Sequence, residues 1–180
     1  FKYLKGPLGF LDFETVAPAI PIWEGCRSYD GVPAQFSCHV ESGDTHVHHE
    51  WIADGVGDPR RGLALALIEA CKGAATILAY NAGFEKGKIR DLAAFLPDLE
   101  RDLLGITERI DDLLPIIRDY VYHPEFRGSF SIKSVLPALC PDLSYKSLKI
   151  GNGSTASWIL ETLVTEPERY SPEERDQHIE

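Results

Sequence analysis

The 180-residue sequence has no methionine and only four cysteines, none of them in a Cys-x-x-Cys pair. Because the cysteines are widely spaced, reduced thiols in a cytosolic protein are the default expectation. The lack of methionine, together with a first residue that is Phe1, predicts a piece of a larger parent chain. We therefore expect a cytoplasmic location and additional domains in the parent protein.

Long apolar runs and an excess of positive charge are also missing. The longest apolar run, residues 63–68, is too short to cross a bilayer, and no charged-then-apolar leader opens the chain. Neither membrane insertion nor secretion is therefore indicated. The formal net charge of −10 argues against a general surface for binding polyanions, which normally needs a basic patch.

The most informative feature that is present is a pair of carboxylates, separated by one aromatic residue, in an apolar run near the start. In an extended strand, side chains alternate between faces, so Asp12 and Glu14 project from one side while Leu11 and Phe13 are buried on the other. Like charges held this close favour a divalent cation that neutralises them. Mg²⁺ or Mn²⁺ suits such oxygen ligands best, although exposed acids at a strand end are the simpler alternative.

Residues 76–86 predict a third carboxylate for the same site. A short apolar strand is stopped by Asn81 and Gly83, and residues 86–95 then have the pattern of a helix. Glu85 therefore falls in the first turn of a helix, where the N-terminus helps to hold an anion. If the two strands are neighbours, all three acids converge.

These segments resemble the motifs of the DEDD exonuclease superfamily, whose members have an RNase H-like fold. The first motif, Asp-x-Glu on the first strand, is matched at residues 12–15. The second, Asn-x-x-Phe-Asp at a strand-to-helix junction, is matched at residues 81–85, with Glu85 in place of Asp. The sequence more specifically resembles a bacterial domain-of-unknown-function family within that superfamily. The blocks that carry this second resemblance are residues 12–15, 58–60, 80–86, 122–124 and 129–133.

The resemblance implies a single RNase H-like α/β domain over residues 1–180, with a mixed β-sheet that contains an antiparallel three-stranded meander and is flanked by helices. It also implies a metal-dependent 3′–5′ exonuclease that hydrolyses phosphodiester bonds at the ends of single-stranded DNA or RNA. Two Mg²⁺ or Mn²⁺ ions would be held by Asp12, Glu14 and Glu85, which would also be the catalytic residues. The residues expected to contact the substrate are Thr15, Asn81, Phe84 and Lys133.

The third motif of the superfamily, Tyr-x-x-x-Asp or His-x-x-x-x-Asp, is not found after the second. Residues 39–44 and 49–54 have the second spacing but lie between motifs one and two. The chain ends in what should be a charged helix beginning after Pro172, where the missing motif would begin. We expect the fourth ligand and the general base to come from sequence beyond it. Asp111 and Asp112 fall within an expected helix, which disfavours them as that ligand.

The other expected elements follow from strand periodicity and from capping residues. Asp58 and Pro59 supply the N-cap and first-turn proline of a helix that Gly73 ends. Gly43 and Asp44 form a hairpin turn. Residues 23–33 are expected to be a long loop that contacts substrate. Strands are predicted at 8–14, 34–40, 45–51 and 76–80, and further helices at 84–95, 98–104, 107–119, 131–139 and 154–164.

Two other functions stay open. The same fold could bind nucleic acid or a partner protein without cutting, because Glu85 and the missing motif leave the metal site incomplete. Alternatively, His46 and His48 share one strand face and could hold the transition metal of a hydrolase. A half-exposed hairpin strand explains these histidines more simply.

A last cluster surrounds the turn at residues 128–129. Its basic and polar side chains could grip phosphates while Phe126 and Phe130 stack on bases, and the alternative is a packed loop whose aromatic residues belong to the core. The polar members of the cluster are Arg118, Tyr122, His123, Arg127 and Lys133.

Overall fold

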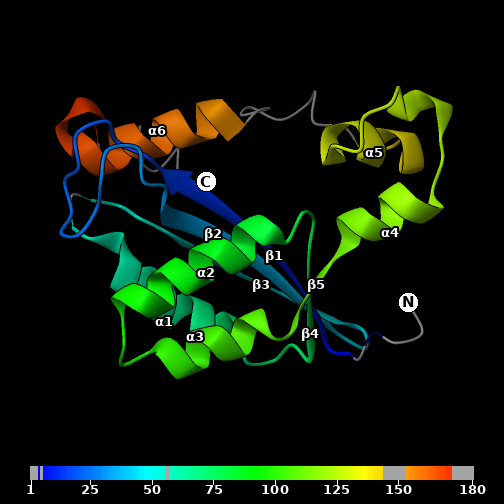
Figure 1. Cartoon of the computed structure of the whole chain (residues 1–180), viewed down its shortest axis with the longest axis horizontal. Coiled ribbons are helices and arrows are strands. Elements are labelled where there is room, and N and C mark those ends of the chain that lie inside the picture. Colours follow the sequence, from blue (N-terminus) through cyan, green and yellow to red (C-terminus); the bar gives the residue numbers. More distant parts are fainter. Residues whose placement is uncertain (1–3, 5, 56, 144–152, 172–180) are drawn as a thin grey trace.

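The computed structural model describes residues 4, 6–55, 57–143 and 153–171. It has a mixed five-stranded sheet with the strand order β3-β2-β1-β4-β5 (Figure 1). The first three strands form an antiparallel meander, and β4 and β5 extend the sheet in parallel with β1. The α/β class, the mixed sheet and the meander are therefore confirmed. The strands are β1 (Leu8–Val16), β2 (Val32–Ser42), β3 (Thr45–Ile52), β4 (Thr76–Ala79) and β5 (Ile110–Asp112).

Helices follow the meander and then alternate with the two parallel strands. Asp58 caps the first helix through its side chain, which accepts from the Arg60 N–H at 3.0 Å, and Pro59 occupies the first turn as expected. None of the helices in the described part of the chain is long and apolar enough to cross a membrane. The helical elements are α1 (Pro59–Cys71), α2 (Gly83–Phe95), α3 (Glu100–Thr107), α4 (Leu113–Tyr120), η1 (Pro124–Phe126), α5 (Ile132–Leu139), α6 (Gly153–Thr165) and η3 (Pro167–Arg169).

The two faces of the sheet are covered by different helices. Leu11 and Phe13 of β1 point into the main core, which the apolar faces of α1, α2 and α3 complete (Figure 1). On the other side, α6 packs near the end of β1, where Leu160 and Val164 join Trp23 in a second, smaller core. The face of β1 that carries Asp12 and Glu14 is thus only partly covered.

The helix expected over residues 107–119 is wrong in its first half. Residues 110–112 form β5, which pairs in parallel with β4, and α4 begins only at Leu113. Ile110 is buried in the main core, so pairing with β4 outweighs the local helical pattern. The helix expected to end at residue 104 is α3, which continues to Thr107. The helix expected after Pro172 lies outside the described residues.

Candidate active site

The first two candidate residues lie on one face of β1, as the alternation predicts. Asp12 is paired with Ser37 of β2 and Glu14 with Gln35, while Phe13 between them is buried. Partial desolvation raises the pKa of Asp12, although a backbone hydrogen bond at Phe13 opposes the rise. Desolvation also raises the pKa of Glu14, and the charge of Asp12 adds to this effect. Asp12 is therefore close enough to Glu14 to disfavour the ionisation of Glu14.

Two side chains from distant parts of the chain act on Glu14. The Ser157 hydroxyl of α6 donates to Glu14 Oε2 at 3.4 Å. The positive charge of Lys133, on α5, also lowers the pKa of Glu14, but less than burial raises it. Lys133, expected to contact substrate, is therefore within electrostatic reach of the carboxylates.

Glu85 is the most perturbed acid of the site. It lies in the first turn of α2 and is only 4 % exposed, and its buried Oε2 has no hydrogen-bond partner among the residues that the structure describes. Its pKa is raised to about 7, mainly by burial and also by the charges of Asp12 and Asp112, while a hydrogen bond from its own backbone N–H opposes the rise. The structure thus brings together the three acids that the sequence analysis selected.

Asp112, whose expected place in a helix disfavoured it as a ligand, is a fourth acid in this group. It ends β5, and its Oδ1 accepts from the backbone N–H of Asn81 and from that of Leu114, both at 2.9 Å. These bonds tie the β4–α2 junction to the start of α4. Asp112 followed by Pro115 in the next turn is an N-terminal helix signal, which could have revealed the position.

The other expected substrate contacts lie around the same edge of the sheet. Asn81 is exposed and has a positive φ of 69°, a conformation that asparagine tolerates better than most residues. Phe84 is 41 % exposed at the start of α2. Thr15 is half-buried and faces Gly31, since a Cβ placed on Gly31 would lie 3.5 Å from Thr15 Oγ1.

Within the described residues, no group of three or more histidine, cysteine, aspartate or glutamate side chains is arranged to hold a metal ion. This applies to the carboxylates as they are placed and also to the histidines of β3. His48 stacks on His39 of β2 with ring centroids 4.1 Å apart, and His46 lies 3.3 Å from Glu41. These histidines are exposed cross-strand neighbours, as a hairpin strand predicts.

Phe126 and Phe130, near residue 128, were expected either to stack on bases or to belong to the core. Phe126 is 3 % exposed and packs edge-on against Phe130, so it belongs to a packed loop. Phe130 is half-buried, and its carbonyl accepts from the Tyr80 hydroxyl at 2.6 Å. Phe126 is therefore unable to stack on a base in this arrangement.

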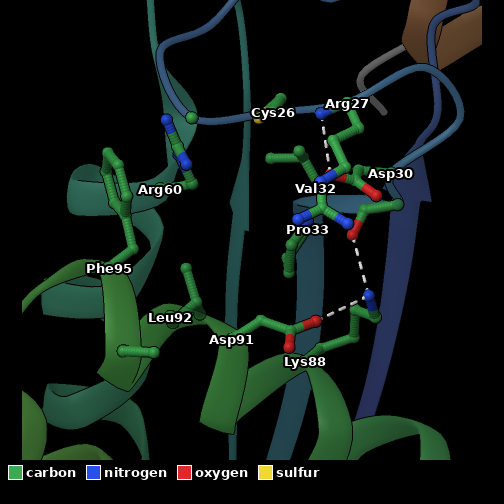
Figure 2. A pocket seen from close by; sticks show the side chains of 13 residues that line it. Cys26, Arg27, Asp30, Val32, Pro33, Arg60, Lys88, Asp91, Leu92 and Phe95 are labelled. Atoms are coloured by element: carbon green, nitrogen blue, oxygen red, sulfur yellow. Dashed lines mark hydrogen bonds and ion pairs between the residues drawn. The ribbon is translucent and has the colours of Figure 1, made fainter.

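A pocket of about 570 Å³ opens between residues 25–33 and α2, the helix that carries Glu85 (Figure 2). Its walls are the end of the loop expected at residues 23–33, the start of α1 and one side of α2. Lys88 of α2 connects the helix to the loop, because its Nζ donates to Gly31 O at 2.9 Å. The same Nζ also donates to Asp91 Oδ2, on α2, at 2.9 Å. The loop was expected to contact substrate, but its partners on α1 and α2 were not identified from the sequence.

Residues 9–131 match the model of a family described as a domain of unknown function, DUF2779. The chain belongs to the DUF2779 family. No curated protein and no solved structure matched the chain. The DUF2779 match agrees with the expected domain of unknown function, and it contains Asp12, Glu14, Glu85 and Asp112, whereas Lys133 and Ser157 lie past its end.

Proposed function

We propose that this DUF2779 domain is a metal-dependent 3′–5′ exonuclease with an RNase H-like fold that acts on single-stranded DNA or RNA. The observation that carries the proposal is Glu85, a buried carboxylate with a pKa of about 7 whose Oε2 has no partner in the described part of the chain and whose ionisation the charges of Asp12 and Asp112 disfavour. Acidic side chains that lie together and have strongly perturbed pKa values are typical of functional sites. The RNase H-like assignment is supported by the meander extended by two parallel strands.

The chemistry of the donors fits Mg²⁺ or Mn²⁺. Asp12, Glu14 and Glu85 offer only carboxylate oxygens, which are the ligands that both ions prefer. A cation would also satisfy Glu85 Oε2 and relieve the repulsion that raises the pKa values of Glu14 and Glu85. Since the side chains as placed do not form a cage, the fit rests on this donor chemistry.

The chain's own residues would position the reacting groups. Bound divalent cations would supply an activated water and neutralise charge on the phosphate. Ser157 would orient Glu14 through its hydrogen bond, Lys133 favours the ionised form of Glu14, and the Lys133 ammonium would attract a phosphate. Asp112, with both hydrogen bonds of its Oδ1 made to backbone N–H groups, would act as a positioning residue for the β4–α2 junction.

The direct test is degradation of end-labelled single-stranded DNA and RNA with Mn²⁺, by this chain and by a version extended past Glu180. We expect Asp12→Asn to lower the cleavage rate by at least about 10³-fold, because metal-assisted charge stabilisation contributes several kcal/mol. Asp111→Asn is the matched control, since Asp111 is an exposed acid on β5 outside the cluster. A folded Asp12→Asn protein that cleaves at the parent rate would contradict the proposal.

A binding module is the second candidate function. The observation that favours it is that no described group of acids or histidines is arranged as a metal cage. In that case both versions of the chain would bind the labelled strands, and neither would cleave them when Mn²⁺ is added. Cleavage that depends on Mn²⁺ and is lost in Asp12→Asn would exclude the binding module.

A further inference from the structure

We propose that the pocket between residues 25–33 and α2 is a subsite for one nucleotide. Its ligand is either a nucleotide within a bound strand or a free mononucleotide, which share the same chemistry. The strand-bound form rests on the proposed function, because it requires nucleic acid at the neighbouring carboxylates. The position, the volume and the lining side chains of the pocket all fit a nucleotide.

The pocket adjoins both elements that carry the candidate acids. Lys88 lies one turn after Glu85 on α2, and it also bonds to Gly31. Gly31 in turn approaches Thr15, the residue after Glu14 on β1. A volume of about 570 Å³ is in the usual range for small-molecule sites, so a single nucleotide can be accommodated.

One wall of the pocket is formed by Arg60 and Phe95, whose side chains stack on each other. The Arg60 guanidinium lies 3.2 Å from the centre of the Phe95 ring, on the left in Figure 2. It is also fixed by Asp58 through three hydrogen bonds of 2.6 to 3.1 Å and by the Glu24 carbonyl at 2.7 Å. Because Asp58 neutralises Arg60, this wall provides a flat surface rather than free charge. Phe95 is still 39 % exposed, and aromatic side chains and guanidinium planes are both surfaces on which bases stack.

The opposite wall supplies the positive charge. Arg27 lies across the pocket from Phe95 (Figure 2), and its side chain forms no ion pair with any residue in the described ranges. The contacts of Arg27 with Asp30 are made by its backbone, whose N–H donates to Asp30 Oδ2 at 2.8 Å and whose carbonyl accepts from the Asp30 N–H at 3.1 Å. An unpaired guanidinium is a suitable bidentate partner for a phosphate.

The floor of the pocket offers both a donor and an acceptor. Lys88 and Asp91 form an ion pair of 2.9 Å, and the Lys88 side chain is only 19 % exposed. The Asp91 carboxylate is more exposed and can accept from the exocyclic amino group of a base. The pocket therefore has a flat wall, a carboxylate acceptor on Asp91 and, opposite the wall, the guanidinium of Arg27. These features together match a base and its phosphate better than they match a simple anion.

Binding is measured by fluorescence anisotropy with a short labelled single-stranded oligonucleotide in EDTA, so that no cleavage occurs. Arg27→Gln removes the free charge and keeps the backbone contact with Asp30. Phe95→Leu removes the aromatic ring. We expect Arg27→Gln to weaken binding several-fold and to lower the salt slope by about one, and Phe95→Leu to weaken it by about 5-fold or more. Arg101→Gln, which removes an exposed charge on α3 outside the pocket, should bind like the parent.

Competition with AMP distinguishes the two sources of the ligand. If AMP displaces the oligonucleotide and its own affinity falls in Arg27→Gln, the subsite accepts a free nucleotide. If the pocket variants weaken the binding of the oligonucleotide but not that of AMP, the subsite binds a nucleotide only within a strand. Parent-like binding of both probes by folded Arg27→Gln and Phe95→Leu, an equal loss in Arg101→Gln, or no binding of either probe would overturn the proposal.

The same measurements separate this proposal from the exonuclease proposal. Asp12→Asn should lose cleavage in Mn²⁺ and should retain the binding measured in EDTA. If no version of the chain cleaves but the pocket variants still weaken binding, the exonuclease proposal fails and the nucleotide subsite remains. If cleavage is observed but the pocket variants bind normally, the subsite fails alone.

Discussion

The two faces of β1 have opposite roles within the same nine residues. Leu11 and Phe13 are 4 % and 3 % exposed and pack into the main core. Asp12 and Glu14, which alternate with them, face a partly open side and have raised pKa values. The first face contributes burial of apolar surface, and the second places like charges close together at a cost in stability. Under the proposed function, the outer face serves the candidate site while the inner face serves folding.

The largest effect expected from this contrast is on the free energy of unfolding. Phe13→Ala should lower it by about 3–5 kcal/mol, because a buried aromatic ring is lost and a cavity remains. Asp12→Ala should leave it unchanged or slightly raised, since repulsion within the cluster is relieved. Urea denaturation in EDTA measures both values. Comparable destabilisation by the two substitutions would mean that both faces serve folding.

The alternation that separates these faces was predictable from the sequence because it is local. Residues 11–14 alternate between apolar and polar side chains, and this pattern predicts which of them are buried. The meander and the first helix were predictable for the same reason, since Gly43, Asp58 and Pro59 act within a few residues of their positions.

A second effect concerns pH, through Glu85. Its pKa is raised from 4.5 to about 7, so the folded state binds the proton more tightly than the unfolded state does. Stability in EDTA should therefore be highest below pH 4.5 as far as this group is concerned, and should fall as the pH rises through about 7. The rise in pKa corresponds to roughly 3 kcal/mol as an upper bound, because part of the charge is screened by solvent.

Glu85→Gln is the matched variant for this effect. It keeps the size of the side chain and removes the titration, so the decline in stability between pH 5 and pH 8 should become shallower. At pH 8 Mn²⁺ should stabilise the parent more than the variant, since a bound ion stabilises the folded state by mass action. The melting temperature across this pH range, with and without Mn²⁺, measures both effects. Identical pH profiles for parent and variant would show that Glu85 is not perturbed.

Other parts of the site depend on contacts between distant segments and could not be predicted from local patterns. The strand β5 has only three residues and forms because Ile110 pairs with β4, while the neighbouring apolar residues have helical spacing. Because β5 was not predicted, the place of Asp112 beside Glu85 was not predicted either. The pocket joins Arg27, Arg60 and Lys88, which are far apart in the sequence, so only its loop was expected.

The smallest effect is expected at Asn81, where the chain leaves β4 for α2. The resemblance to exonucleases assigns this residue to substrate binding, whereas its φ of 69° indicates a role in backbone geometry. Asn81→Ala should destabilise the protein by about 1 kcal/mol, because an L-residue with a Cβ resists the left-handed conformation, and Asn81→Gly should be nearly neutral. The backbone N–H that donates to Asp112 is present in both variants.

Activity separates the two roles of Asn81. If the asparagine serves backbone geometry, Asn81→Gly should retain both stability and Mn²⁺-dependent cleavage, and Asn81→Ala should lower the stability by about 1 kcal/mol. If its amide contacts the substrate, Asn81→Gly should keep its stability and raise the KM. In that second case the substrate-binding surface extends from the outer face of β1 onto the exposed turn after β4. Asn81 would then serve both backbone geometry and substrate binding, whereas on β1 the two roles belong to different residues.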